Sequence, residues 1–392
     1  MSVAHGASRS NRAGRLNPAS AASVAAVAAV ILVVLGSVLL SSCSSPTTTS
    51  ATTVITTDPS AMHLAATFLD EYQASDGRIV RRDQGGDSVS EGQAYGMLLA
   101  VATHDAARFA SIWNWTKENL QQPSGLFAYR WSDGAIVGTG AATDADLDTA
   151  WALVLAARSF GDPTYETDGL AVASAVLANE TVVSGGRLEL VAGPWARNAP
   201  YSVDPSYFSP EAMAALAKAS GDPRWTQLEA NSEQVVSELQ GGDSTRYLPP
   251  DWALLAPSGA ISASSPPSGG EPPSYGLDAQ RVPVWYAADC TASGRALSAD
   301  DWSTIRGLAA SGSYLAYGLT GAVQSTYSND LGLVASAASA DAAGQRSQGG
   351  ALLAQAQSGG NGQTYYGNAW VALGTVLLTT KVLSPCPPAP AS

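Results

Sequence analysis

Apolar residues recur at helical spacing through most of the chain after residue 60, and few stretches alternate between apolar and polar positions. Glycine, proline, asparagine and aspartate separate the apolar stretches. The pattern predicts twelve helices, at approximately residues 61–73, 91–103, 106–120, 146–160, 163–179, 209–221, 223–239, from 278, 300–313, from 329, 342–357 and 369–378.

Two helix junctions share the tripeptide Gly-Asp-Pro, at residues 161–163 and 221–223. Glycine ends a helix, aspartate caps the next one and proline fits its first turn. The repeat predicts helical hairpins, and twelve helices make six of them. We therefore predict an all-α fold, an (α/α)6 barrel of six inner and six outer helices.

In such a barrel the inner helices all run in one direction, so their N-termini share one rim. If inner and outer helices alternate, the inner ones begin near Glu91, Asp144, Phe208, Asp278, Asn329 and Gly367. Long loops precede four of these starts, at residues 77–89, 125–143, 185–207 and 251–277. Function tends to gather in long loops on a regular scaffold. We expect the three carboxylates among these starts to converge on that rim.

Glu91 lies at the start of its helix, where Ser90 is a candidate N-cap. Gly92 and Gly96 flank it and permit another group to approach closely. A purely structural interpretation is also open, because a first-turn glutamate is stabilised by the helix dipole.

The other two carboxylates have structural interpretations of the same kind. Residues 143–146 read Thr-Asp-Ala-Asp and fit a capping pattern around Asp144, and Asp278 fits a simple N-cap. Capping alone does not explain why three acidic residues stand at the starts of inner helices.

The charge balance narrows the classes of partner. The formal net charge is −13, and residues 1–43 carry three arginines and no other charged residue, which leaves −16 on the remainder. This charge disfavours nucleic acid and anionic lipid surfaces and suits a neutral or cationic substrate. Beyond residue 43 only two histidines and two cysteines remain, so neither a zinc site nor another cofactor is expected.

The N-terminus reads as an export signal at residues 1–43. Arginines precede an apolar run at residues 21–40, and Leu-Ser-Ser-Cys follows. The last four residues resemble a bacterial lipoprotein processing box in which Cys43 carries the lipid. Because the run is also long enough to span a bilayer, an uncleaved membrane anchor is the alternative.

The rest divides into a Thr/Ser-rich linker at residues 44–59, a catalytic body at residues 60–383 and a Pro-rich tail at residues 384–392. The body is expected outside the cytoplasm, tethered to the outer face of the membrane or secreted. In that compartment Cys290 and Cys386 either form one disulfide or remain two free thiols.

Three carboxylates around one cleft suit glycoside hydrolysis, which needs a protonated acid and an ionised base or nucleophile. A first-turn position lowers the pKa of Glu91, so burial and repulsion from Asp144 must outweigh the helix dipole for an acid. Asp278, beside Arg281, is expected to stay ionised. The same loops hold aromatic residues, some of which are expected to stack on sugars: Tyr129, Trp131, Trp195, Tyr201, Tyr207, Tyr247, Trp252 and Tyr275.

Three motifs resemble those of glycoside hydrolase family 8. Residues 90–97 resemble the family's general-acid motif, and residues 142–160 its signature with Thr149 in place of Ile or Met. Residues 275–283 resemble the segment that carries the base, although Gly276-Leu277 separates a tyrosine and an aspartate that the family joins.

Further segments, at residues 127–131, 204–208 and 248–252, are especially similar to the endoglucanases that accompany bacterial cellulose synthases. The resemblance implies an inverting, metal-free endo-β-1,4-glucanase with Glu91 as general acid and Asp278 as general base, about 6.5–9.5 Å apart. It also implies that Asp144 binds and distorts the central sugar. Candidate substrate contacts are Tyr95, Trp131, Asp146, Tyr207, Tyr275 and Arg281.

Alternatives remain open at this point. Other family members act on mixed-linkage glucan, chitosan or xylan, and a catalytically silent glycan-binding partner of a polysaccharide synthase is a different class. A helical toroid that only holds a protein partner leaves the acidic helix starts unexplained. The expected partners are a β-glucan and, as a candidate, a polysaccharide synthase, with the chain a monomer attached to the membrane by its N-terminus.

Overall fold

The computed structural model describes residues 58–241, 246–311, 313–359 and 364–384, all within the unit Val54–Ser392. In these ranges twelve α-helices occur: α1 (Pro59–Tyr72), α2 (Ser90–Ala102), α3 (Ala106–Asn119), α4 (Thr143–Phe160), α5 (Pro163–Asn179), α6 (Pro210–Ser220), α7 (Pro223–Leu239), α8 (Val282–Ala288), α9 (Ala292–Ser311), α10 (Leu331–Ala342), α11 (Arg346–Gln357) and α12 (Tyr365–Thr379). None of the helices in the described ranges has the length and apolarity to cross a bilayer. The expected signal, Cys43 and the start of the linker lie outside these ranges.

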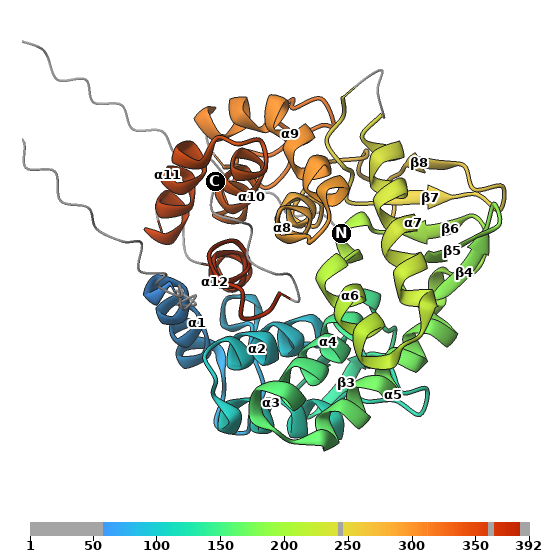
Figure 1. Cartoon of the computed structure of the whole chain (residues 1–392), viewed down its shortest axis with the longest axis vertical. Helices are drawn as coiled ribbons and strands as arrows, with labels where there is room; N and C mark the ends of the chain where they lie inside the picture. Colours follow the sequence, from blue (N-terminus) through green and yellow to red (C-terminus); the bar gives the residue numbers. More distant parts are fainter. Residues whose placement is uncertain (1–57, 242–245, 312, 360–363, 385–392) are drawn as a thin grey trace, which may run out of the picture. The chain divides into compact units, whose positions relative to one another are not determined.

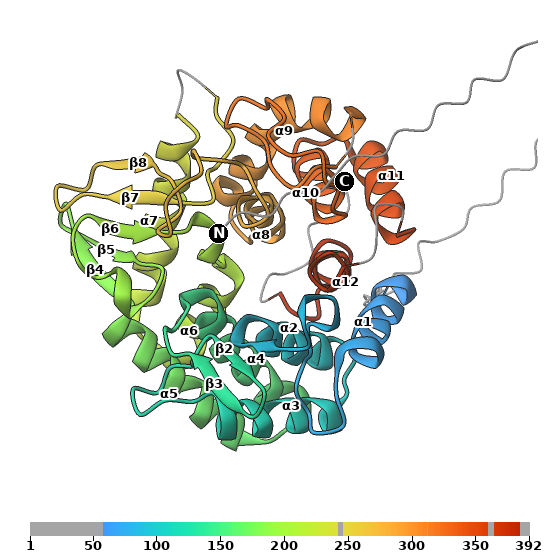
Figure 2. The same ribbon diagram turned by 180° about the vertical axis from the view of Figure 1, so that it is seen from behind.

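The even-numbered helices form an inner ring and the odd-numbered helices surround it (Figures 1 and 2). Each inner helix contacts the next, and contacts between α12 and α2 close the ring. In α2 every residue except Glu91 is buried, whereas α3 buries only one face. The predicted (α/α)6 barrel is therefore confirmed.

Both Gly-Asp-Pro corners have the predicted geometry. Gly161 and Gly221 are left-handed, with φ of 72° and 68°. The carboxylates of Asp162 and Asp222 each accept a backbone N–H two residues later at 2.9 Å, and proline opens the next helix. The tripeptide is thus a sufficient local signal for these turns.

Four helix starts differ from the prediction by four residues or more. Helix α8 begins at Val282 instead of residue 278, because a 3-10 turn at Ala279–Arg281 precedes it. Helix α9 begins at Ala292, eight residues before the expected start, because its first two turns are small and polar and show little periodicity. Helix α10 continues to Ala342, so α11 begins four residues later than expected. Helix α12 begins at Tyr365, where the hydroxyl of Thr364 caps it by accepting the N–H of Gly367.

Within the part of the chain that the structure describes, eight short strands, which the sequence pattern did not reveal, lie in the loops between helices. They are β1 (Ser88–Val89), β2 (Arg130–Ser132), β3 (Ala135–Gly138), β4 (Thr181–Ser184), β5 (Arg187–Leu190), β6 (Tyr201–Val203), β7 (Ala253–Leu255) and β8 (Ile261–Ala263). Strands of two to four residues carry too little alternation to be recognised.

The antiparallel sheets join loops that precede neighbouring inner helices. Strand β1 pairs with β2, with Ser88 opposite Trp131, and so ties the loop before α2 to the loop before α4. Strand β6 pairs with β7, with Tyr201 opposite Leu255, and ties the loop before α6 to the loop before α8. These sheets hold the rim loops in register with one another.

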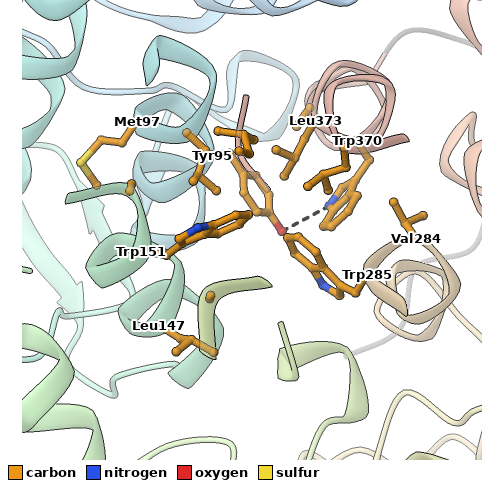
Figure 3. Packing of buried hydrophobic residues seen from close by; sticks show 14 of the residues in the cluster. Tyr95, Met97, Leu147, Trp151, Val284, Trp285, Trp370 and Leu373 are labelled. Atoms are coloured by element: carbon orange, nitrogen blue, oxygen red, sulfur yellow. Dashed lines mark hydrogen bonds between the residues drawn. The ribbon is translucent and has the colours of Figure 1, made fainter. Parts of the chain in front are cut away.

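Large aromatic side chains from four inner helices fill the centre of the ring (Figure 3). Tyr95 packs edge-on against Trp370 at 5.5 Å between ring centroids, Trp370 against Trp285 at 5.1 Å, and Trp285 against Trp151 at 6.2 Å. All four side chains are almost fully buried. The barrel is therefore a filled core, and any binding site must lie at its ends.

Candidate active site

Glu91 lies in the first turn of α2, as predicted, but Ser90 does not cap the helix. Strand β1 runs directly into α2, so Val89 occupies the cap position and makes no side-chain capping bond. Ser90 is already helical, and its N–H donates to the carbonyl of Tyr129 at 3.0 Å. The predicted N-cap is wrong because pairing with the neighbouring loop determines where the helix begins.

The glycines beside Glu91 permit the close approach that the sequence predicted. A Cβ atom on Gly92 would lie 2.0 Å from the hydroxyl oxygen of Tyr365. A Cβ atom on Gly96 would lie 2.6 Å from the side chain of Ile79. Side chains of α12 and of the preceding loop thus pack directly on this face of α2.

Asp144 does not take part in the predicted capping pattern. Thr143 Oγ1 donates to the carbonyl of Val191 at 2.6 Å, and Ala142 precedes the helix without a side-chain cap. Asp144 Oδ1 accepts the N–H of Ala145 at 2.8 Å, which leaves Oδ2 facing the centre of the rim. Capping does not account for Asp144.

Asp278 likewise makes no side-chain capping bond. It precedes a single 3-10 turn (Ala279–Arg281) that leads into α8, and its carboxylate points back to Arg281, with 3.3 Å between Oδ1 and Nη2. The interpretation of Asp278 as a simple N-cap is therefore wrong.

One buried guanidinium connects all three carboxylates. Arg281 Nη1 lies 2.8 Å from Glu91 Oε1 and 2.9 Å from Asp144 Oδ2, while Nη2 contacts Asp278. The side chain of Arg281 is only 2% exposed, compared with 23% for Glu91, 8% for Asp144 and 38% for Asp278. The predicted convergence on one rim is confirmed, and Arg281 is its centre.

The carboxylates open into a cavity of about 220 Å³. Its walls come from the loops before α2, α4, α6 and α8. The lining residues are Arg81, Val89, Ser90, Glu91, Tyr129, Ala142, Asp144, Tyr207, Asp278 and Arg281. The cavity is therefore a rim site built by four of the six inner helices.

The surroundings of Glu91 favour its protonated form. Burial, followed by repulsion from Asp144, raises the pKa of Glu91 to about 7, against the opposing effect of Arg281. Its Oε1 accepts hydrogen bonds from Tyr95 at 2.7 Å and from Arg281, so Oε2 is the oxygen that can carry the proton. Burial thus outweighs the helix dipole, as an acid requires.

Asp278 was expected to stay ionised because of Arg281. Arg281 does lower the pKa of Asp278, but burial has the larger effect. Burial raises the pKa of Asp278, and Arg281 opposes that rise. Although the carboxylate is 38% exposed, it lies in a crowded cleft where protein atoms restrict its hydration. Its pKa is therefore higher than an arginine neighbour alone would make it.

Tyr95 is absent from the cavity lining but binds Glu91 through its hydroxyl. Its hydroxyl donates to Glu91 Oε1 and accepts hydrogen bonds from Arg281 Nη1 at 3.0 Å and from Trp370 Nε1 at 3.2 Å (Figure 3). Since Tyr95 is 1% exposed, the direct substrate contact expected for it is replaced by a positioning role.

Two other candidate substrate contacts lie away from the cavity. Asp146 is fully buried, and its Oδ1 accepts the N–H of Phe127 at 2.8 Å. Tyr275 is buried against Tyr317, with 6.5 Å between ring centroids, in a separate cluster. Both residues were expected to contact the sugar directly. This expectation is wrong, because the helical and loop geometry turns their side chains inward.

The remaining aromatic candidates differ in position. Tyr207 lines the cavity, with its ring centroid 5.4 Å from the guanidinium carbon of Arg281. Trp131 is outside the cavity lining, edge-on to Trp115 and beneath the guanidinium of Arg78. Of this pair, Tyr207 alone is in direct reach of a ligand beside the carboxylates.

Sequence reasoning missed two supporting residues. Ser206 Oγ accepts a hydrogen bond from Arg281 Nη2 at 2.6 Å and donates to Asp204 at 2.6 Å. Asp251 binds the segment that carries Asp278. Both lie in segments whose resemblance was noted at the sequence level, but no local pattern indicates these partners.

A group of carboxylates close enough to hold a metal ion lies apart from this cavity. Oxygens of Glu229, Glu233 and Asp289 all lie within 4.8 Å of one another. The N–H and hydroxyl of Thr291 donate to Asp289, and the hydroxyl also contacts Glu233. These bonds belong to the start of α9 and give the group a structural role.

Cys290, next to this group, is disulfide-bonded. Cys386, its expected partner, lies outside the described residues.

The hydroxyl of Ser384 donates to Glu211 in α6 at 3.2 Å, which fastens the last described residue of the chain to the barrel.

Comparisons with known proteins show similarity to one family over most of the chain. The model of "Glycosyl hydrolases family 8" matches residues 31–380. A "probable endoglucanase" of Novacetimonas hansenii is 35% identical over 228 residues, which cover 56% of this chain and 65% of that protein. An endoglucanase of Cellulomonas uda is 32% identical over 233 residues, which cover 57% and 63%. The match thus spans less than two thirds of each relative.

A solved structure matches over a larger share. The endo-β-1,4-glucanase from Acetobacter xylinum superposes with a TM-score of 0.68 at 26% identity, covering 82% of this chain and 98% of that one. A β-1,3-1,4-glucanase from Paenibacillus, with a TM-score of 0.73 at 22% identity, shares the fold.

Proposed function

The chain belongs to glycoside hydrolase family 8, and from this premise we propose that it cleaves internal β-1,4 linkages of cellulose-like glucans with inversion of configuration. The single observation that carries the proposal is the set of three carboxylates around the Arg281 guanidinium in an open cavity. The names of the relatives support β-1,4-glucan as the substrate.

Glu91 is the general acid. A pKa of about 7 keeps a large fraction protonated at neutral pH, and Oε2 is free to deliver the proton to the glycosidic oxygen. After transfer, the carboxylate is stabilised by Arg281 and Tyr95, which already bind Oε1. The hydrogen bonds that Tyr95 and Arg281 donate to Oε1 are therefore compatible with both the protonated and the ionised form of Glu91.

Asp278 is the general base, which takes a proton from the water that attacks the anomeric carbon. Its 38% exposure supports this role, because the attacking water must reach it from the cleft. Glu91 and Asp278 contact different terminal nitrogens of the Arg281 guanidinium, and inversion requires that a water fit between the two carboxyl groups.

Asp144 and Tyr207 hold the sugar between acid and base. Asp144 lines the cavity between the other two carboxylates and is anchored by Arg281, so its contact with a sugar hydroxyl is directional. Tyr207 supplies an aromatic surface next to it. Together they bind the central sugar and favour its distortion.

The test is hydrolysis of carboxymethylcellulose by the purified chain, followed by reducing-end release. Proton NMR of cello-oligosaccharide products should show the α-anomer first, since inversion at a β-linkage produces it. Parallel assays with lichenan, chitosan and xylan define the substrate. A chain that binds cello-oligosaccharides but releases no reducing ends from any of them is a binding protein, and the proposal then fails.

The cellular setting is part of the proposal. We place the barrel outside the cytoplasm, attached through lipidated Cys43, in a position to trim glucan chains beside a polysaccharide synthase. The apolar run before Leu-Ser-Ser-Cys supports this setting. The intact mass of the N-terminal peptide from membranes distinguishes a diacylated Cys43 from an uncleaved anchor.

A further inference from the structure

Asp251 is bound to both sides of the segment that carries Asp278. Its Oδ1 accepts the N–H of Gly276 at 3.0 Å and of Ala279 at 2.8 Å. Its Oδ2 accepts the hydroxyl of Ser274 at 2.7 Å, and its own N–H donates to the carbonyl of Ser274 at 2.8 Å. One side chain therefore closes the turn on which Asp278 stands.

This turn is where the chain departs from the pattern it resembles. Gly276 and Leu277 separate Tyr275 from Asp278, and Tyr275 is fixed by backbone bonds to Tyr317 at 2.7 and 3.0 Å. A Cβ atom on Gly276 would lie 2.3 Å from Asp251 Oδ2, so glycine is needed for the carboxylate to fit. Asp251 thus holds the two added residues in one conformation.

We propose that Asp251 is a positioning residue that sets the location of Asp278 relative to the cleft. The proposal rests on the proposed function, because Asp278 is the base only if the chain is a hydrolase. Asp251 acts on Asp278 through the backbone, since the carboxylate of Asp251 is already hydrogen-bonded to Ser274, Gly276 and Ala279.

Burial, followed by repulsion from Asp278, raises the pKa of Asp251 to about 6. The other charged or titratable groups whose fields couple to Asp278 are Arg281, Asp144, Glu91, Asp204, Tyr207 and Tyr366.

The experiment compares four variants on carboxymethylcellulose. Asp251→Ala removes the three side-chain bonds to the turn and should lower kcat by about 100-fold with KM within about threefold of wild type, because misplacement by about 1 Å has an effect of that size. Asp251→Asn keeps an oxygen for both N–H groups, so kcat should stay within about threefold. Ser274→Ala removes only the Oδ2 contact and should also stay within about threefold.

Asp162→Ala is the matched control. Asp162 accepts the N–H and hydroxyl of Thr164 in the corner before α5, far along the chain from Asp278. Asp162→Ala also removes a carboxylate that accepts a backbone N–H, and its kcat should equal that of the wild type.

The outcomes separate this inference from the proposed function. An inactive wild type contradicts the proposed function itself. An active wild type with kcat preserved in Asp251→Ala, or with equal losses in Asp251→Ala and Asp251→Asn, overturns the positioning role. If Asp251→Ala does not fold, Asp251→Asn still decides: a 100-fold loss of kcat in that variant overturns the inference.

Discussion

At the scale of single residues, the site depends on one buried arginine. Arg281 is surrounded by Glu91, Asp144 and Asp278, and a buried charge with fewer partners costs several kcal/mol. Burial raises the pKa of Glu91 and of Asp278, and the charge of Arg281 opposes that rise in both.

Glu91→Gln tests the acid directly. The amide is similar in size and keeps an oxygen that accepts hydrogen bonds from Tyr95 and Arg281, but it has no acidic proton. We expect kcat on carboxymethylcellulose to fall by about 10²–10⁴-fold with KM nearly unchanged. Circular dichroism controls for folding, and a loss below tenfold contradicts the assignment.

Asp278→Asn tests the base in the same assay. The amide cannot accept the proton of the attacking water, so kcat should fall over the same range of about 10²–10⁴-fold. Substrates with activated leaving groups should rescue Glu91→Gln but not Asp278→Asn, because only the acid assists departure. Rescue of both variants alike is evidence against separate roles.

The pH dependence follows from the same groups. As the proposed acid, Glu91 acts in its protonated form, and burial raises its pKa to about 7, so kcat/KM should decline as the pH rises through about 7. As the proposed base, Asp278 acts in its ionised form, so kcat/KM should also decline on the acid side, at a pH above the ordinary aspartate range. A profile from pH 4 to 9 measures both limbs, and a flat alkaline side contradicts the role of Glu91.

At the scale of elements, close packing between helices depends on glycines. Gly349 and Gly350 are neighbours in α11, but they face different surroundings. A Cβ atom on Gly349 would lie 2.9 Å from the carbonyl oxygen of Ala337 in α10, whereas one on Gly350 meets no atom within 4 Å. Alanine substitutions at these two positions therefore distinguish the effect of helix propensity on stability from the effect of helix packing.

Gly350→Ala should stabilise the fold by about 0.5–1 kcal/mol, because alanine loses less backbone entropy than glycine in a helix. Gly349→Ala should destabilise it by about 1–3 kcal/mol, because α11 must move away from α10. Thermal unfolding of the two variants measures the difference. Equal stabilisation by both indicates that α11 does not pack closely on α10.

At the scale of the whole molecule, burial raises the pKa of many carboxyl groups and so favours their protonated forms. Burial raises the pKa of Glu91, Glu189 and Glu229 to about 7, of Asp146 and Glu211 to about 8, and of Asp251 to about 6. Between the unfolded pKa values near 4 and these folded values, the native state binds more protons than the unfolded state. Its stability therefore decreases as the pH rises through this window.

We expect the Tm to be at least about 5 °C higher at pH 5 than at pH 8. The mutual repulsion of a chain with a net charge of −13 acts in the same direction. Differential scanning calorimetry at constant ionic strength measures the shift. Asp146→Asn removes one of the titrating groups and should reduce the difference, and a Tm that rises toward pH 8 contradicts the account.

The sequence by itself determined the local features: the number of helices, their pairing into hairpins, the Gly-Asp-Pro corners and the rim on which three carboxylates gather. Helical periodicity, capping and turn chemistry act over a few residues and can be read directly. The roles of Glu91, Asp144 and Asp278 came from motifs that resemble a family.

Only the tertiary structure decided which side chains meet. Arg281 lies 190 positions after Glu91, and their contact depends on closure of the inner ring. The same closure buries Tyr95 and Asp146, directs Tyr275 into another cluster and places Asp251 against the turn of Asp278. Local sequence contains no signal for such pairs, because the partners of a side chain are set by how distant helices pack around the core.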